Sequence, residues 1–148
     1  MRFASFLAVF LAVAQFARAE PPILSAPDAF AAVEAGEIVL LDIRSRQEWT
    51  ETGLAEGAWP VSMHERDFGV RLQAILNRYA ADQIALICAT GGRTAHVVKV
   101  LEQNGIQGVI DVSEGMEGNQ RGPGWIARGM SVVTLSDALA EYQSVFPE

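Results

Sequence analysis

Short runs of apolar residues, separated by segments with helical spacing, constrain the fold of this chain more than any other feature. Two runs are continuous, Ile38–Leu41 and Ile84–Ile87, and Val109–Val112 forms a third. Such runs are typical of strands buried on both faces of a parallel sheet. The segments 68–79 and 94–103 carry apolar residues at helical spacing instead. The pattern therefore predicts an α/β fold with a mostly parallel central sheet and helices on both faces.

Capping and breaking residues predict where the remaining elements begin and end. Ser25 is expected to cap a helix that stops at Gly36, and Ser45 to cap a short helix ended by Gly53. Pro60 favours an edge position for a weak strand over 58–61, because proline donates no ladder hydrogen bond. Three further expectations are an irregular Gly-rich segment over 113–129, a cap at Ser136 and a last helix from Asp137 to about Val145.

The first nineteen residues have the layout of a secretory signal peptide. Met1-Arg2 is followed by the apolar run Phe3–Ala14 and then by Ala17-Arg18-Ala19, a small-residue cleavage pattern. The run is shorter than the roughly 20 residues that span a bilayer, and an uncleaved anchor is the alternative. We expect cleavage after Ala19, a short leader over 20–24 and one domain over 25–148. The mature chain is then expected in a periplasm or outside the cell, with no stable membrane span.

Charge and cysteine content exclude several classes of function. The chain has 148 residues, 11 Lys and Arg against 18 Asp and Glu, and a formal net charge of −7. An acidic balance argues against a nucleic-acid partner, because phosphate is met by a basic face. The single cysteine excludes an internal disulfide and any zinc site built on two or more cysteines. Cys88 is therefore a small buried apolar residue or a working thiol.

The segment that follows the second apolar run favours the working thiol. Cys88 stands at the end of the expected strand, and carboxyl ends of parallel strands are where such sheets bind ligands. Glycines let backbone N–H groups converge, a helix N-terminus adds partial positive charge, and an arginine adds a full one. These surroundings lower the pKa of a thiol and bind an anion in front of it. The segment thus predicts a cysteine nucleophile for an oxyanion substrate, the alternative being a Gly-rich turn with a surface arginine. The expected binding residues are Ala89, Thr90, Gly91, Gly92, Arg93 and Thr94.

The sequence C-A-T-G-G-R-T from Cys88 to Thr94 resembles the active-site loop of rhodanese-like sulfurtransferases. Other elements agree with that family in the same order, over nearly all of residues 25–134. They are Leu40–Arg44 with Glu48-Trp49, then Gly57-Ala58, then Gly115-Met116-Glu117 with Trp125, Gly129 and Val132. The chain departs from the family at Leu54 and Glu56, where His and Pro are usual. It also has a longer late element, Gly118–Gly124, which is expected to line the mouth of the site.

The resemblance implies that a sulfane sulfur passes from thiosulfate, or a similar anionic donor, through a persulfide on Cys88. The acceptor would be a thiol, cyanide or a periplasmic protein. The loop amides would stabilise the extra sulfur and Arg93 would hold the donor, with no metal or organic cofactor. One alternative is a non-catalytic or persulfide-carrier interaction module. Another is a cysteine-dependent phosphatase or arsenate reductase, but related enzymes of that kind have five residues between Cys and Arg. Only four separate Cys88 and Arg93.

Several residues outside the loop are candidates for a supporting role. Asp42, at a strand end, is expected to form an ion pair with Arg44 or to touch substrate. Arg121 and Arg128 either extend the anion site or are solvated surface charges. Trp125 is expected to pack in the core, as tryptophans commonly do, or to wall the pocket beside the Gly-rich segment. His64 and His96 are expected at the surface, because a thiolate nucleophile needs no base.

Overall fold

The central sheet has five parallel strands, and the computed structural model describes residues 20–147. The strand order is β1-β6-β5-β2-β4, and every neighbouring pair is parallel. The bounds are Ile23–Leu24 for β1, Val39–Asp42 for β2, Ala58–Pro60 for β4, Ile84–Ile87 for β5 and Ile110–Val112 for β6. The prediction of a mostly parallel sheet is confirmed, and the strand that holds Pro60 lies at its edge as expected.

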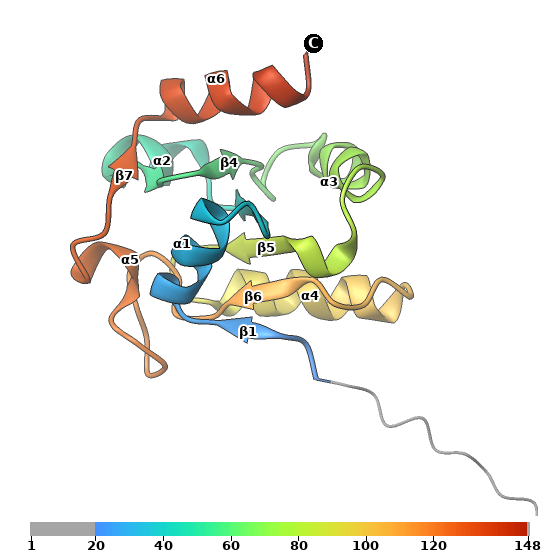
Figure 1. The fold of residues 1–148 in the computed structure, drawn as a ribbon, viewed down its shortest axis with the longest axis horizontal. Coiled ribbons are helices and arrows are strands. Elements are labelled where there is room, and N and C mark those ends of the chain that lie inside the picture. Colours follow the sequence, from blue (N-terminus) through green and yellow to red (C-terminus); the bar gives the residue numbers. More distant parts are fainter. Residues whose placement is uncertain (1–19, 148) are drawn as a thin grey trace, which may run out of the picture.

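Helices cover both faces of this sheet (Figure 1). They are α1 (Ala26–Glu34), α2 (Arg46–Thr52), α3 (Phe68–Leu76), α4 (Gly92–Gln103), α5 (Gly124–Ala127) and α6 (Leu135–Val145), with a 3₁₀ turn at Ala81–Gln83. Neighbouring residues of one strand point to opposite faces. Leu40 therefore packs in a core cluster with residues of α1 and α5, whereas Leu41 packs with residues of α3 and α4. Helices on both faces are confirmed.

A second, smaller sheet was not predicted from the sequence. It pairs β3 (Leu54–Ala55) with β7 (Val132–Val133) in antiparallel register. Strand β1, formed by Ile23–Leu24, likewise lies in the segment expected to be a leader. Two-residue strands are too short to show an alternating pattern, so only their partners in the fold define them.

Three helices begin after a residue whose side chain accepts a hydrogen bond from an N–H group of the first turn. Ser25 accepts from Asp28 N, and Ser45 forms a capping box with Glu48. The expected cap at Ser136 is wrong, because α6 begins at Leu135 and Thr134 accepts from Asp137 N. Thr134 has an acidic residue three positions on, the more favourable arrangement for a cap. Helix α4 begins two residues earlier than expected, because Gly91 in left-handed conformation leads directly into it.

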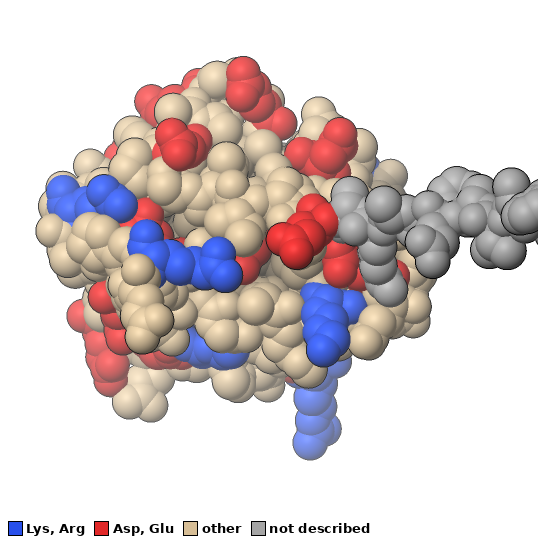
Figure 2. Space-filling model, turned by 90° about the horizontal axis from the view of Figure 1, so that it is seen from below, with Lys and Arg blue, Asp and Glu red and all other residues tan. Residues whose placement is uncertain are grey.

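The surface carries mixed charge, and the expected signal peptide over 1–19 lies outside the described residues. On the face shown in Figure 2, basic and acidic side chains are interspersed. Within residues 20–147, no helix combines the length and the apolar character needed to cross a bilayer.

Candidate active site

Cys88 is the first residue after β5, the central strand of the sheet. Its side chain is fully buried and packs in the same cluster as Leu86, two residues earlier on the same face. The strands β1, β5 and β6 end on the side of the molecule where α5 lies (Figure 1). The thiol therefore lies at the carboxyl edge of the sheet, where the sequence placed it.

The loop after Cys88 folds back toward the sulfur. Gly91 has φ of 85°, a left-handed conformation, and its N–H donates to Cys88 Sγ at 3.2 Å. Thr94 Oγ1 lies 3.7 Å from the same sulfur and donates to the carbonyl of Gly91 at 2.9 Å. The turn and the first residues of α4 thus surround the sulfur with hydrogen-bonding groups.

Residues after β6 brace this loop through its carbonyl groups. The N–H groups of Met116 and Glu117 each donate at 2.8 Å, to the carbonyls of Cys88 and Ala89 respectively. Asn119 Nδ2 donates at 2.7 Å both to Thr90 O and to Ser113 O. The Cys88 loop is therefore held by Met116, Glu117 and Asn119, of which Asn119 belongs to the Gly118–Gly124 segment that was expected to line the mouth of the site.

Two glycines allow this close approach. A Cβ on Gly91 would lie 2.1 Å from Ser113 O, and a Cβ on Gly115 would lie 2.3 Å from Ala89 O. Both residues also have positive φ, which side-chain-bearing residues rarely adopt. The brace and the loop can meet only because neither residue has a side chain.

Arg93 forms a two-point ion pair with Glu48 of α2. Its Nη1 donates to Glu48 Oε2 at 2.8 Å, and its Nη2 donates to Glu48 Oε1. The hydrogen bonds from Arg93 lower the pKa of Glu48 to about 2, with help from Ser45 and against the effect of burial. The same contact raises the pKa of Arg93, to which the charges of Glu48, Cys88 and Asp42 also contribute.

Sequence reasoning missed two partners of Arg93. Glu48 entered only as part of a family motif, and its capping box with Ser45 gave no sign that it also binds Arg93. His64 was expected to have a surface role, yet its Nε2 lies 3.2 Å from Arg93 Nη1. No local pattern links these residues, because the three come from different connections of the fold.

The pair Asp42 and Arg44 is structural. Both side chains are 0% exposed, and Arg44 Nη2 lies 2.7 Å from Asp42 Oδ2. Arg44 also donates to Thr52 Oγ1 and Gly53 O, so it ties the end of β2 to the end of α2. Neither side chain is available to touch a substrate.

Trp125 belongs to the core, so the prediction that it walls the pocket is wrong. The side chain is 0% exposed, stacks edge-to-face on Phe30 at 5.7 Å, and donates through Nε1 to Ser131 O. Arg121 is exposed beside Asn119. Arg128 is engaged by Glu114 at 3.1 Å.

Asp111 of β6 is a buried carboxyl close to the loop. Burial raises its pKa, against the effects of hydrogen bonding to Thr94 and of the charge of Arg121. Its side-chain Oδ1 has no hydrogen-bond partner among residues 20–147. In the same part of the chain, no three His, Cys, Asp or Glu side chains are grouped closely enough to hold a metal ion.

A family model matches the part of the chain that contains the Cys88-to-Arg93 loop. The model, described as the rhodanese-like domain, covers residues 25–121, which include Glu48, Cys88 and Arg93. The chain belongs to the rhodanese-like domain family. The resemblance seen in the sequence is thereby confirmed at the level of the family.

Solved structures share the fold of this rhodanese-like domain. The rhodanese-like domain of an Anabaena protein is 21% identical, with 80% of this chain and 83% of that chain covered and a TM-score of 0.59. The polysulfide-sulfur transferase homodimer of Wolinella succinogenes is also 21% identical, with 77% and 79% covered and a TM-score of 0.55. An uncharacterized protein of Rickettsia rickettsii is 25% identical over 95 residues, which are 58% of this chain and 75% of that protein.

Proposed function

We propose that this rhodanese-like domain is a sulfurtransferase that moves a sulfane sulfur through a persulfide on Cys88. The observation that carries the proposal is the hydrogen bond from Gly91 N to Cys88 Sγ, 3.2 Å long, in a loop that runs directly into α4. The first N–H groups of a helix have no acceptor inside that helix. Those of Gly92, Arg93 and Thr94 are thus available, beside the Gly91 amide, to an anionic sulfur extending from Cys88.

The proposed donor is thiosulfate or a similar anion with a sulfane sulfur. The Cys88 thiolate attacks the outer sulfur, a new S–S bond forms, and the S–S bond of thiosulfate breaks. Its electron pair leaves with sulfite, and Cys88 keeps the sulfur as a persulfide anion. In the second step an acceptor such as cyanide or a thiolate attacks the outer sulfur. The acceptor keeps that sulfur, and Cys88 returns to the thiolate form, so no redox partner or metal is needed.

The charges around Cys88 suit an anionic donor. Arg93 has five N–H groups, of which two bind Glu48 and one faces His64. The other two have no partner among residues 20–147 and remain for a ligand. The N-terminus of the twelve-residue helix α4 adds partial positive charge at the same place. The Glu48 carboxylate fixes the guanidinium plane, so the donor meets an ordered pair of N–H groups.

Mass measurement of the intact protein tests the proposal. Incubation with thiosulfate is expected to add roughly 32 Da, one sulfur atom, and cyanide is expected to remove it. Cys88→Ser, which leaves the chain with no thiol, is expected to gain nothing. Thiocyanate turnover then separates an enzyme from a persulfide carrier. No gain by a free, reduced thiol would contradict thiosulfate as the donor, and Cys88-dependent hydrolysis of an aryl phosphate would favour a phosphatase instead.

The place of action is part of the same proposal. The expected signal peptide puts the mature domain in a periplasm or outside the cell, with a small anionic donor and a thiol, cyanide or protein acceptor. Expression of the full chain in a bacterium with a periplasm tests this. N-terminal sequencing of the exported protein is expected to begin at Glu20, and an intact Met1 in the cytoplasmic fraction would contradict export.

A further inference from the structure

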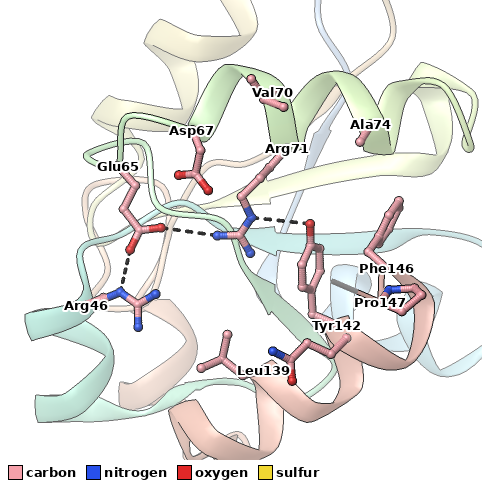
Figure 3. Close-up of a pocket in the computed structure, with 11 residues that line it drawn as sticks. Arg46, Glu65, Asp67, Val70, Arg71, Ala74, Leu139, Tyr142, Phe146 and Pro147 are labelled. Carbon is pink, nitrogen blue, oxygen red and sulfur yellow. Dashed lines mark hydrogen bonds and ion pairs between the residues drawn. The ribbon is translucent and has the colours of Figure 1, made fainter.

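His64 lies on a connection whose backbone is fixed on several sides. Its own N–H donates to Ser62 Oγ at 3.2 Å, and the preceding Met63 N donates to Ile43 O at 3.1 Å. The following residue, Glu65, forms ion pairs with Arg46 at 2.6 Å and with Arg71 at 3.3 Å. Figure 3 shows Glu65 between these two arginines. The imidazole is thus presented from an ordered segment.

The exposed imidazole of His64 contacts the guanidinium of Arg93, the cation of the candidate active site. Its Nε2 lies 3.2 Å from Arg93 Nη1. A guanidinium only donates hydrogen bonds, so a hydrogen bond between the two groups requires Nε2 to act as the acceptor. Protonation of Nε2 would remove the acceptor and set two cations against each other.

The charged groups around His64 are mostly paired with one another. Arg93 of α4 is the cation in contact, and Glu48 of α2 binds the same guanidinium, with its Oε2 on the Nη1 that also contacts His64. On the connection that carries His64, Glu65 forms ion pairs with Arg46 and Arg71. Exposed Arg66 and Asp67 follow it and have opposite charges. The anionic sulfur donor is the one further charged group that the proposed function brings to this place. A dianion bound beside both Arg93 and His64 would favour the protonated imidazole.

We propose that His64 is an anion-recognition residue of the Cys88 site, pairing with Arg93 around the anionic sulfur donor and taking up a proton when the donor binds. This inference rests on the proposed function. It makes donor binding stronger at lower pH, because binding and protonation favour each other.

The pH dependence of donor binding in two histidine variants tests this role. The dissociation constant of thiosulfate is taken from the concentration dependence of single-turnover persulfide formation between pH 5.5 and pH 8.5. In the wild type it is expected to fall about tenfold toward the acidic end, the effect of one charged hydrogen bond. His64→Gln is expected to remove that fall. His96→Gln is the matched control, because His96 is the only other histidine and is exposed on α4.

A second measurement needs no sulfur transfer. In Cys88→Ser, sulfate serves as an unreactive dianion, and the ring resonances of His64 are followed by NMR as the pH is changed. Sulfate is expected to move the protonation of His64, but not of His96, to higher pH. If Cys88 loads sulfur and neither measurement distinguishes the two histidines, the inference on His64 is overturned while the proposed function stands. If Cys88 fails to load, the proposed function fails, and the sulfate result alone decides whether His64 recognises anions.

Discussion

Glu48 and Arg93 lie 45 residues apart in the chain and form a two-point ion pair beside the Cys88 loop. The contact joins α2, which follows β2, to the start of α4, which follows β5. It therefore fixes the only arginine of the loop relative to a neighbouring connection of the sheet.

Replacing Glu48 with Gln is expected to reduce stability in a pH-dependent way. The pKa of Glu48 is lowered to about 2, chiefly by hydrogen bonds from Arg93. The resulting stabilisation is present in full above the ordinary value of 4.5 and is lost as the pH falls toward about 2. At pH 7, Glu48→Gln should lower the free energy of unfolding by about 1 kcal/mol, since both side chains are partly exposed.

Urea unfolding at pH 7, 4 and 3 measures this difference, which should shrink as the pH falls. Glu51→Gln is the control, because Glu51 is an exposed residue of the same helix whose side chain, within residues 20–147, bonds only to Gln47. Equal losses for both variants at pH 7 would show that the ion pair with Arg93 adds no stability.

Replacing Gly91 with Ala is expected to disrupt the loop, whereas the same change at Gly92 is not. A Cβ on Gly91 would lie 2.1 Å from a backbone oxygen and at positive φ, but a Cβ on Gly92 meets nothing within 4 Å. Gly91→Ala should cost at least about 2 kcal/mol of stability. Gly92→Ala, at the first position of α4, should leave stability equal or slightly higher. Chemical denaturation of the two variants checks the contrast, and a stable Gly91→Ala would contradict the tight contact with Ser113.

Removing the amide of Asn119 is expected to loosen the loop without unfolding the domain. Asn119 Nδ2 bonds to both Thr90 O and Ser113 O, so Asn119→Ala should cost about 1–2 kcal/mol. Persulfide formation should slow, because the loop amides are held less firmly in position. Amide hydrogen exchange across 89–94 and the rate of mass gain with thiosulfate test this. Gln120→Ala, at an exposed neighbour, should change neither rate, and equal behaviour of the two variants would refute the brace.

Truncating buried Arg44 is expected to be far more costly than truncating exposed Arg46. Arg44→Met leaves the fully buried carboxylate of Asp42 without its cation, which costs about 3–5 kcal/mol. Arg46 is 58% exposed in its pair with Glu65, so Arg46→Met should cost about 0–1 kcal/mol. Urea unfolding compares the two. Should Arg44→Met fail to fold, the double change Asp42→Asn with Arg44→Met should restore part of the stability, and no recovery would contradict an uncompensated charge as the cause.

The sequence by itself determined the parallel sheet, its two covered faces and the position of Cys88 at the end of the central strand. These features depend on local patterns: apolar runs such as Ile84–Ile87, helix caps such as Ser45, and glycines after the cysteine. Local patterns act over a few residues, so a single chain displays them directly. The same reasoning failed at Trp125, because an indole ring beside a Gly-rich segment suits a pocket wall and a core equally well.

Only the tertiary structure decided how the charged groups of the site are paired. Glu48, His64 and Arg93 come from connections that follow three different strands, and they meet because β4, β2 and β5 are adjacent in the sheet. Asn119 reaches the Cys88 loop because β6 is the other neighbour of β5. Strand order depends on packing over the whole chain, and no local spacing encodes it. Residues far apart in sequence therefore become partners only once the sheet has formed.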